Sequence, residues 1–159
     1  MSIEICEYKA EDVDDAVKQL WLGLAHEMFG IEHFILPSEA NANKWVKFVH
    51  DSLAGKRGFL LAAKIGNKPI GFAYGTIFRD YPIEVSELTA SINDLYVLPE
   101  FRGKGIGKKL IVESLNRLKT EGVKSVRLTV LTNNEAALKL YKKLGFKIYQ
   151  YGMTKTLKR

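Results

Sequence analysis

The sequence predicts a mixed α/β fold, in which one central sheet is flanked by about four helices, and three observations lead to this prediction. Several short segments alternate apolar and polar side chains, as half-buried strands do. Longer stretches between them carry apolar residues at helical spacing, and a glycine-rich turn joins one strand to one helix. The 159-residue chain contains no repeat or low-complexity linker, so we expect a single domain over residues 1–159.

The N-terminal part is expected to form one strand followed by two helices. An apolar alternation over residues 3–8 starts the strand, and residues 11–30 carry apolar side chains at helical spacing, with Gly30 as the stop. A loop is expected over residues 34–38. The second helix is expected over residues 41–53, and Gly55 ends it.

Three strands are expected next. The first two cover residues 59–65 and 70–78, and the turn-forming residues 66–69 between them predict a hairpin. Tyr81-Pro82 interrupts this pattern. A longer strand over residues 91–98 resumes it and ends at a proline, which lacks a backbone donor.

Helices and strands alternate in the C-terminal part. A helix is expected from Ile106 to near Gly122, followed by a strand over residues 125–131 and a helix over residues 134–144. A final hairpin is expected over residues 148–157. The predicted order is therefore strand, two helices, three strands, helix, strand, helix, and one or two further strands.

Composition restricts the function classes. The formal net charge is +6 and the isoelectric point is near 9.3, which suits a polyanionic ligand. Lysines concentrate around residues 104–109 and 142–147. Aromatic residues are not interleaved with the basic ones as stacking on bases requires, so nucleic acid is not an expected partner. Phosphate groups of a cofactor are the expected one.

The cellular setting follows from three absences in the sequence. Cys6 is the single cysteine, so no intrachain disulfide is expected, and the start lacks the charge and apolar pattern of a secretory leader. No apolar run approaches the roughly 20 residues of a membrane span. These features predict a cytoplasmic protein without a membrane partner.

A glycine-rich turn over residues 97–108 is the strongest functional signal. Its glycines alternate with other residues where a helix begins, so unpaired backbone N–H groups can converge without interference from Cβ atoms. The helix dipole adds partial positive charge there. Full positive charges come from Arg102, Lys104 and Lys108. The turn is therefore predicted to hold a phosphate or pyrophosphate.

Spacing excludes two common phosphate loops. A dinucleotide fingerprint that starts at Gly103 needs a glycine at position 108, where the chain has Lys108. A P-loop needs a glycine five residues before Gly107 and a Ser or Thr after Lys108, but Arg102 and Lys109 stand there.

The pattern that remains is Arg102-x-x-Gly105-x-Gly107 after a strand that ends in residues 95–97. A second pattern lies downstream, Asn134-x-x-Ala137-x-x-x-Tyr141-x-x-x-Gly145-Phe146. Together they resemble the acetyl-CoA motifs of the GNAT superfamily of N-acetyltransferases. The resemblance implies a mixed, mainly antiparallel sheet of six or seven strands with about four helices. It also implies acetyl-CoA as the acetyl donor.

The resemblance further implies a set of cofactor-binding residues. These are Leu95, Tyr96, Val97, Arg102, Gly103, Lys104, Gly105, Ile106, Gly107, Lys108, Asn134, Ala137, Tyr141 and Lys143. Main-chain groups of the first three would bond the pantetheine arm. Tyr141 would be the catalytic general acid that protonates the departing thiolate. Two alternatives stay open: Tyr141 can fill a core face, and Asn134 can cap its helix.

The chain departs from the family pattern at Asn93, where relatives carry a glutamate as candidate base. An amide cannot take a proton at neutral pH. Asp94, Glu84 and Glu87 are the alternatives, but strand alternation sends Asp94 to the opposite face from Asn93. Without a strong base, an α-amine or another amine of low pKa is a somewhat easier acceptor than a lysine-like amine.

We therefore expect an acetyl-CoA-dependent N-acetyltransferase that acts on a primary amine, either of a small molecule or of a protein or peptide. The alternative is a CoA-binding module that has lost catalysis, as Asn93 would allow. The three histidines lack metal-site spacing, so no metal is expected. Trp21 and Trp45 are interpreted as packing residues rather than a substrate cage. Edge-strand pairing would allow a homodimer.

Overall fold

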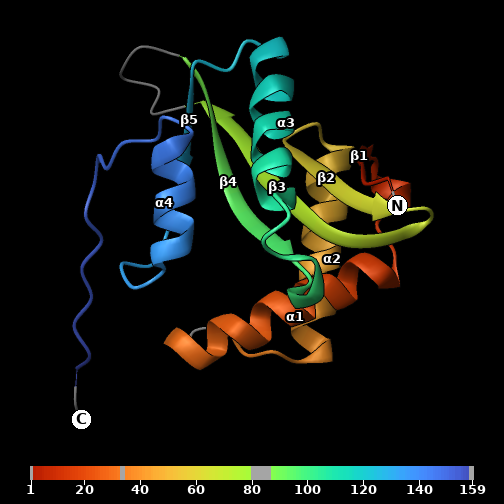
Figure 1. Cartoon of the computed structure of the whole chain (residues 1–159), viewed down its shortest axis with the longest axis horizontal. Coiled ribbons are helices and arrows are strands. Elements are labelled where there is room, and N and C mark those ends of the chain that lie inside the picture. Colours follow the sequence, from red (N-terminus) through yellow and green to blue (C-terminus); the bar gives the residue numbers. More distant parts are fainter. Residues whose placement is uncertain (1, 33–34, 80–86, 158–159) are drawn as a thin grey trace. The chain divides into compact units, whose positions relative to one another are not determined.

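The computed structural model describes residues 2–32, 35–79 and 87–157 (Figure 1). The chain divides into two compact units, Met1–Thr129 and Val130–Arg159, which we describe separately as unit 1 and unit 2. The single domain predicted over residues 1–159 stays a prediction. Tyr81-Pro82, Glu84 and the start of the loop predicted over residues 34–38 lie outside the described residues.

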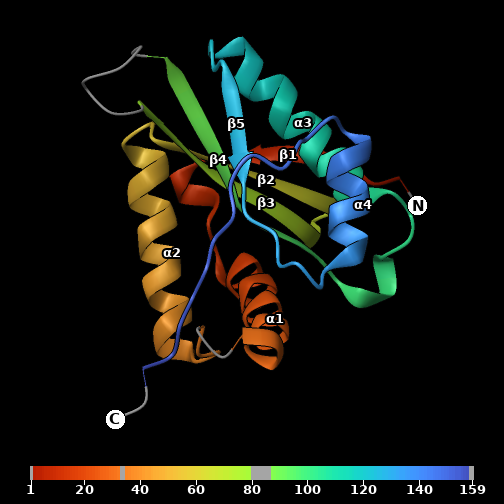
Figure 2. The same ribbon diagram turned by 90° about the vertical axis from the view of Figure 1, so that its left-hand side faces the viewer.

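Unit 1 contains a sheet of five strands among its described residues, in the order β1-β2-β3-β4-β5. Neighbouring strands are antiparallel except β4 and β5, which are parallel (Figures 1 and 2). The strands are β1 Glu4–Tyr8, β2 Gly58–Ile65, β3 Lys68–Arg79, β4 Leu88–Val97 and β5 Ser125–Leu128. The helices of this unit are α1 Asp15–Glu32, α2 Glu39–Ala54 and α3 Ile106–Thr120. The predicted mixed, mainly antiparallel α/β fold is confirmed.

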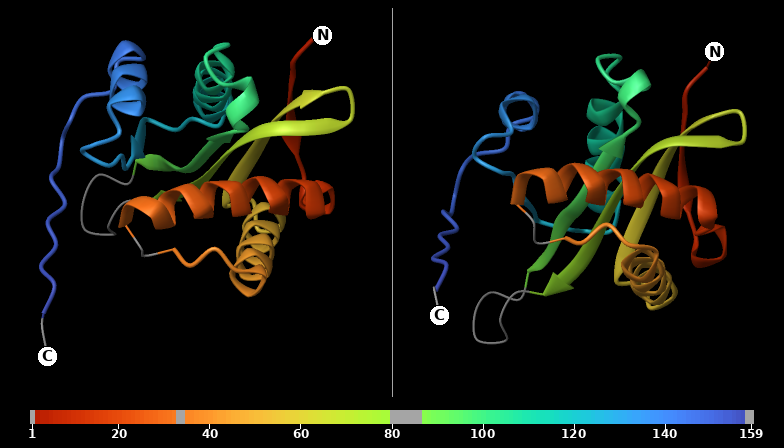
Figure 3. Two further views of the ribbon diagram at one scale, coloured as in Figure 1. Left: turned by 60° about the horizontal axis from the view of Figure 1, so that its bottom comes forward. Right: turned by 90° about the horizontal axis from the view of Figure 1, so that it is seen from below.

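The two faces of the sheet are covered by different helices. Figure 3 shows α1 and α2 on one face and α3 on the other. The main core lies between the sheet and the first two helices. Its buried residues are Val17, Leu20, Trp21, Ala25, Ala42, Val49, Leu60, Phe72, Tyr74 and Tyr96. Trp21 and Trp45 stack with ring centroids 5.7 Å apart, so both contribute to packing, as predicted.

Helix boundaries differ from the prediction for local reasons. Residues 10–12 form a short 3₁₀ turn, so α1 begins at Asp15 rather than at residue 11. The second helix begins earlier than predicted because the Ser38 side chain accepts a hydrogen bond from the Asn41 N–H and caps it.

Unit 2 contains one helix, α4 Glu135–Lys143, and no strand among its described residues. The hairpin predicted over residues 148–157 is therefore not formed, and the sheet has five strands instead of six or seven. Ile148, Tyr151 and Leu157 are exposed. The isoleucine and tyrosines of this segment have strand propensity, but a strand also needs a partner for its backbone hydrogen bonds.

Candidate active site

The glycine-rich turn follows β4 and opens α3 in unit 1. Gly103 and Gly105 have φ angles of 75° and 77°, the left-handed region that side chains rarely adopt. A Cβ atom added at either glycine would meet nothing within 4 Å. The two glycines therefore bend the backbone and leave open space beside it, as a bound phosphate requires.

The start of α3 supplies the donors for such an anion. The Lys109 N–H donates to the Gly105 carbonyl at 3.0 Å, and this hydrogen bond closes the first turn of the helix. The N–H groups of residues 106–108 precede that turn and point out of the helix end. The positive end of the helix dipole lies at the same place. The backbone of this short segment therefore presents unpaired N–H groups and positive charge at one place, as the prediction of a phosphate site requires.

The Arg102 side chain connects the glycine-rich turn to neighbouring elements. Its Nε donates to the Val97 carbonyl at 2.8 Å, and its terminal nitrogen pairs with the Glu27 carboxylate of α1 at 2.6 Å. The guanidinium also lies 5.3 Å from the ring centroid of Tyr96. The sequence predicted that Arg102 adds positive charge at the phosphate site. In the structure the side chain ties α1, β4 and the turn together, while Lys104 and Lys108 are exposed.

One edge of β4 is open beside the turn. β4 pairs with β3 as far as Val97, whereas its pairing with β5 runs from Thr89 to Ile92. Among the described residues of this sheet, Leu95, Tyr96 and Val97 therefore have a neighbouring strand on one side. An extended pantetheine arm needs such an edge, because its amides bond a backbone as a further strand does.

A β-bulge in β4 corrects the sequence interpretation of Asp94. Tyr74 of β3 lies opposite Asp94, and the next residue Gly75 lies opposite Ile92, so Asn93 is an extra residue in β4. The Thr76 hydroxyl donates to the Asn93 side-chain oxygen at 3.4 Å. Tyr74 and Thr76 share one face of β3. Asn93 and Asp94 therefore share that face too, and the prediction of opposite faces is wrong.

The carboxylate of Asp94 lies against the aromatic residues of α2 and β3. The Trp45 indole N–H donates to it at 3.0 Å. Burial raises the pKa of Asp94 from 3.8 to about 6, although the hydrogen bond from Trp45 opposes the rise. Burial also raises the pKa of Tyr74, with a further contribution from the charge of Asp94. Sequence alternation alone missed this cluster because it contained no sign of the bulge.

Unit 2 carries the second predicted motif on α4. Asn134 caps the helix, since its side chain accepts from the Ala137 N–H at 3.1 Å. Tyr141 is buried and lies edge-on to Phe146 at a centroid distance of 5.8 Å. Burial raises the pKa of Tyr141, so its hydroxyl keeps its proton at neutral pH. Lys143 is exposed in the last turn.

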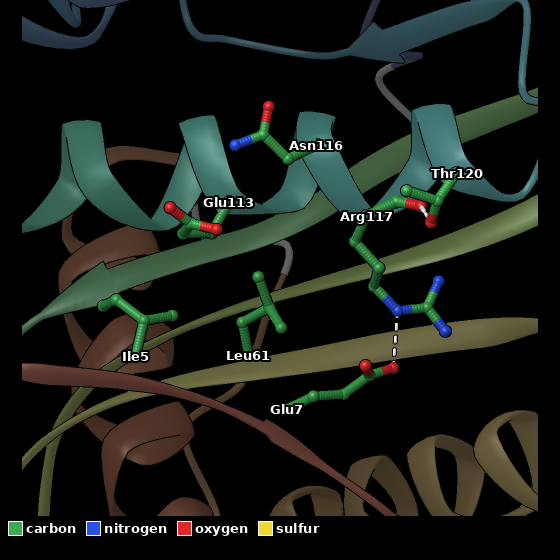
Figure 4. A pocket seen from close by; sticks show the side chains of 7 residues that line it. All are labelled: Ile5, Glu7, Leu61, Glu113, Asn116, Arg117 and Thr120. Atoms are coloured by element: carbon green, nitrogen blue, oxygen red, sulfur yellow. Dashed lines mark hydrogen bonds and ion pairs between the residues drawn. The ribbon is translucent and has the colours of Figure 1, made fainter.

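A separate cavity of about 300 Å³ lies between α3 and the strands β1 and β2. Figure 4 shows Glu7 of β1 and Arg117 of α3 pointing toward each other across it. The two side chains form an ion pair with an N–O distance of 2.5 Å. The other lining residues are Ile5, Leu61, Glu113, Asn116 and Thr120. The glycine-rich turn contributes no residue to this cavity.

Two further properties of the described part of the chain bear on the chemistry. Residues 2–32, 35–79 and 87–157 contain no group of three or more His, Cys, Asp or Glu side chains placed to hold a metal ion. Within the same ranges, every helix is too short or too polar to cross a membrane.

Comparisons with known proteins identify the family to which the chain belongs. Residues 19–146 match the model of the acetyltransferase (GNAT) family, and the chain belongs to this family. An uncharacterised N-acetyltransferase of Methanocaldococcus jannaschii is 34% identical over 105 residues, which cover 65% of this chain and 46% of that protein. This chain thus spans less than half the length of that relative.

Two other proteins are similar over nearly their whole length. A spermidine N(1)-acetyltransferase of Thermoplasma acidophilum is 27% identical over 154 residues, which cover 93% of this chain and 90% of the relative. The crystal structure of a variant Bacillus halodurans protein superposes with a TM-score of 0.80 at 21% identity, covering 97% of this chain and 99% of the other. The similarity to the Bacillus halodurans structure supports the fold.

Proposed function

We propose that this protein is an acetyl-CoA-dependent N-acetyltransferase that transfers an acetyl group to a primary amine of a small molecule, peptide or protein. The backbone cradle at the start of α3 carries the proposal, because it combines open space, convergent N–H groups and positive charge. Membership of the acetyltransferase family supports the choice of acetyl-CoA among phosphate-bearing ligands.

Each part of the cradle and its strand has a distinct role in this proposal. The N–H groups of residues 106–108 would hold the pyrophosphate, with Lys104 and Lys108 adding charge, and Arg102 would keep the turn in place. The open edge over residues 95–97 would bond the pantetheine arm. A backbone N–H on that edge would polarise the thioester carbonyl as negative charge develops on its oxygen. When bound, acetyl-CoA supplies the activated acetyl group.

Tyr141 is the proposed general acid. Its role rests on the motif of the family and on the chemistry of the residue itself. A phenol with a pKa above its ordinary value is a proton donor throughout the neutral range, and a departing thiolate is a base of comparable strength. Asn134 retains its capping role in this proposal.

The function is tested by an acceptor screen that reads release of free thiol from acetyl-CoA. The panel contains peptides, amino acids, aminoglycosides and polyamines, the last because a relative is named for spermidine. We expect release with at least one primary amine. Tight binding of acetyl-CoA without release from any amine would instead support a CoA-binding module.

Gly105→Glu tests the cradle directly. The new carboxylate would stand in the open space and repel the pyrophosphate, so we expect acetyl-CoA affinity, measured by calorimetry, to fall at least about 100-fold. Gly30→Glu is the control, because Gly30 is also exposed with nothing within 4 Å of an added Cβ. Near-normal affinity in a folded Gly105→Glu variant would contradict the assignment.

A further inference from the structure

The net charge of the protein is not shared between its two units. Residues 130–159 contain seven lysine and arginine residues and one acidic residue, Glu135, so unit 2 has a formal net charge of +6. Residues 1–129 contain 17 basic and 17 acidic residues, so unit 1 is neutral. The whole excess of positive charge therefore belongs to the last 30 residues. Such an asymmetry attracts anionic partners to one part of the molecule.

The C-terminal part of unit 2 combines this charge with exposed apolar side chains. We call residues 146–157 the basic segment; it follows α4 as an open trace in Figure 1 and contains neither helix nor strand. The sequence has no aspartate or glutamate after Glu135. Lys147 and Lys155 are exposed, and Tyr151 and Met153 between them are 80% and 96% exposed. Apolar side chains exposed together in this way are typical of a surface that binds a partner.

The order of side chains along the basic segment indicates what kind of partner fits. In an extended backbone, every second residue lies on the same face. Lys147, Tyr149, Tyr151, Met153 and Lys155 would then form one row, with a lysine at each end and apolar groups in the middle. The two lysines are eight residues apart, which is about 26 Å at the rise of a strand. A peptide that pairs with the segment as a further strand would fit this row with an apolar centre and acidic flanks.

The basic segment starts at the proposed general acid. The Phe146 N–H donates to the Tyr141 carbonyl at 3.0 Å, and the two rings lie edge-on at a centroid distance of 5.8 Å. A peptide bound along the segment from Phe146 onward would therefore have its first residue beside Tyr141. The acidic residues that follow would meet Lys147 and Lys155. Neither lysine belongs to the predicted cofactor-binding set, so their charges are available to an acceptor.

We propose that the acceptor is a primary amine carried on an acidic peptide or protein, and that the basic segment binds the acidic residues next to this amine. The inference rests on the proposed acetyltransferase function and names its substrate class. A polyamine or an aminoglycoside carries several positive charges, so the charge of unit 2 repels it. The transfer forms a C–N bond at the peptide nitrogen and breaks the thioester C–S bond. The hydrogen that leaves the nitrogen ends on the thiol of free coenzyme A.

The first experiment compares acceptor peptides of equal length that share an apolar centre and carry flanks of aspartate, serine or arginine. One set has a free α-amine, and a second set has a blocked N-terminus and one internal lysine, so the two sets identify the reacting amine. At low ionic strength we expect kcat/KM for the aspartate peptide to exceed that for the serine peptide at least about 10-fold. The arginine peptide and spermidine are expected to be poorer still. Salt at about 0.5 M should remove most of this preference, because it screens exposed charges.

The second experiment reverses the charge of the basic segment. Each Lys→Glu change lowers the charge by two, so Lys147→Glu combined with Lys155→Glu leaves unit 2 at +2. We expect kcat/KM for the aspartate peptide to fall at least about 10-fold, chiefly through KM, and that for the arginine peptide to rise. Lys68→Glu combined with Lys119→Glu makes the same change of charge at exposed positions of unit 1 and is expected to keep the preference. Affinity for acetyl-CoA is expected to stay nearly unchanged in both double variants.

The third experiment tests the apolar middle of the row. Tyr151→Ser removes a side chain that is 80% exposed, so the fold is expected to be unaffected, and thermal unfolding checks this. We expect the KM for the aspartate peptide to rise about 5-fold or more, because aromatic side chains supply much of the contact in peptide recognition. The kcat/KM for a small alkylamine is expected to stay unchanged, since such an acceptor is too short to cover the row.

The outcomes separate this inference from the function on which it rests. A protein that binds acetyl-CoA and acetylates no amine overturns the proposed function and the inference with it. An active wild type that acetylates the aspartate and serine peptides equally, or that prefers spermidine, overturns the inference and leaves the acetyltransferase function in place. The same holds if the peptides show no preference and the basic segment instead binds a single-stranded oligonucleotide or anionic vesicles. These comparisons use the wild type and do not depend on the folding of any variant.

Discussion

At the scale of single residues, burial of the Asp94 carboxylate has a cost in stability that depends on pH. Its folded-state pKa of about 6 exceeds the ordinary 3.8, so the fold favours the neutral acid. The contribution of this group to stability is full below about pH 4 and is lost as the pH rises through about 6. The difference corresponds to roughly 3 kcal/mol when ionisation is complete.

Asp94→Asn should therefore stabilise the protein at pH 8 by up to about 3 kcal/mol and change it little at pH 4, as measured by urea unfolding. The asparagine keeps an oxygen for the Trp45 N–H, so packing is maintained. Asp51 provides a control of opposite sign, because its hydrogen bond from Lys47 lowers its pKa. Equal effects of Asp94→Asn at both pH values would contradict the assigned burial.

Tyr141→Phe separates the acid from the packing residue. The change keeps the ring and its edge-on contact with Phe146 but removes the proton donor. If the hydroxyl protonates the thiolate, kcat should fall about 100-fold or more, with acetyl-CoA affinity nearly unchanged. An unchanged kcat would identify a packing residue. A defect confined to the KM for acetyl-CoA would mean that Tyr141 seats the donor and another group supplies the proton.

At the scale of elements, the central strands require a glycine beside the bulge. A Cβ atom at Gly75 would lie 2.4 Å from the Ser91 carbonyl oxygen and 2.5 Å from the Phe59 ring. The first is backbone in the neighbouring strand and the second is a fully buried side chain. Neither can move without shifting the ladder in which Asn93 bulges.

Gly75→Ala should accordingly lower the free energy of unfolding by about 1 to 3 kcal/mol, the usual cost of overpacking. Gly30→Ala, in α1 with nothing within 4 Å, should leave stability unchanged or raise it by up to about 1 kcal/mol. Thermal unfolding of the two variants beside the wild type checks the contrast. A Gly75→Ala variant as stable as the wild type would mean that β3 and β4 are less tightly paired than described.

Element types were predictable from the sequence wherever the apolar pattern extended over a long stretch. The helices α1, α2 and α3 and the strands β2 and β3 were expected within a few residues of their observed bounds. The β-bulge at Asn93 was not predictable. An extra residue in a strand leaves the local composition unchanged and changes only the face of the sheet on which each side chain lies. The brace made by Arg102 was also missed, since its partner Glu27 lies far away in the sequence.

At the scale of the whole molecule, the backbone features of the site were more predictable than its side-chain features. A turn of alternating glycines at a helix start can be recognised within a dozen residues, and Gly103 and Gly105 lie in such a turn, at positive φ. The surroundings of Asp94 depend on α2, β3 and β4 together, which no local pattern reports. The strand count was overestimated because the described residues contain no hairpin over residues 148–157.

The order of the sheet has a consequence for synthesis of the chain. The strands β1 to β4 lie side by side in the sheet in the order in which they leave the ribosome. The β2–β3 and β3–β4 pairs join segments that are close in the sequence, which keeps the entropy cost of closing the chain small. The pairing of these four antiparallel strands involves no residue beyond Val97, so they can assemble before β5 joins the edge of β4.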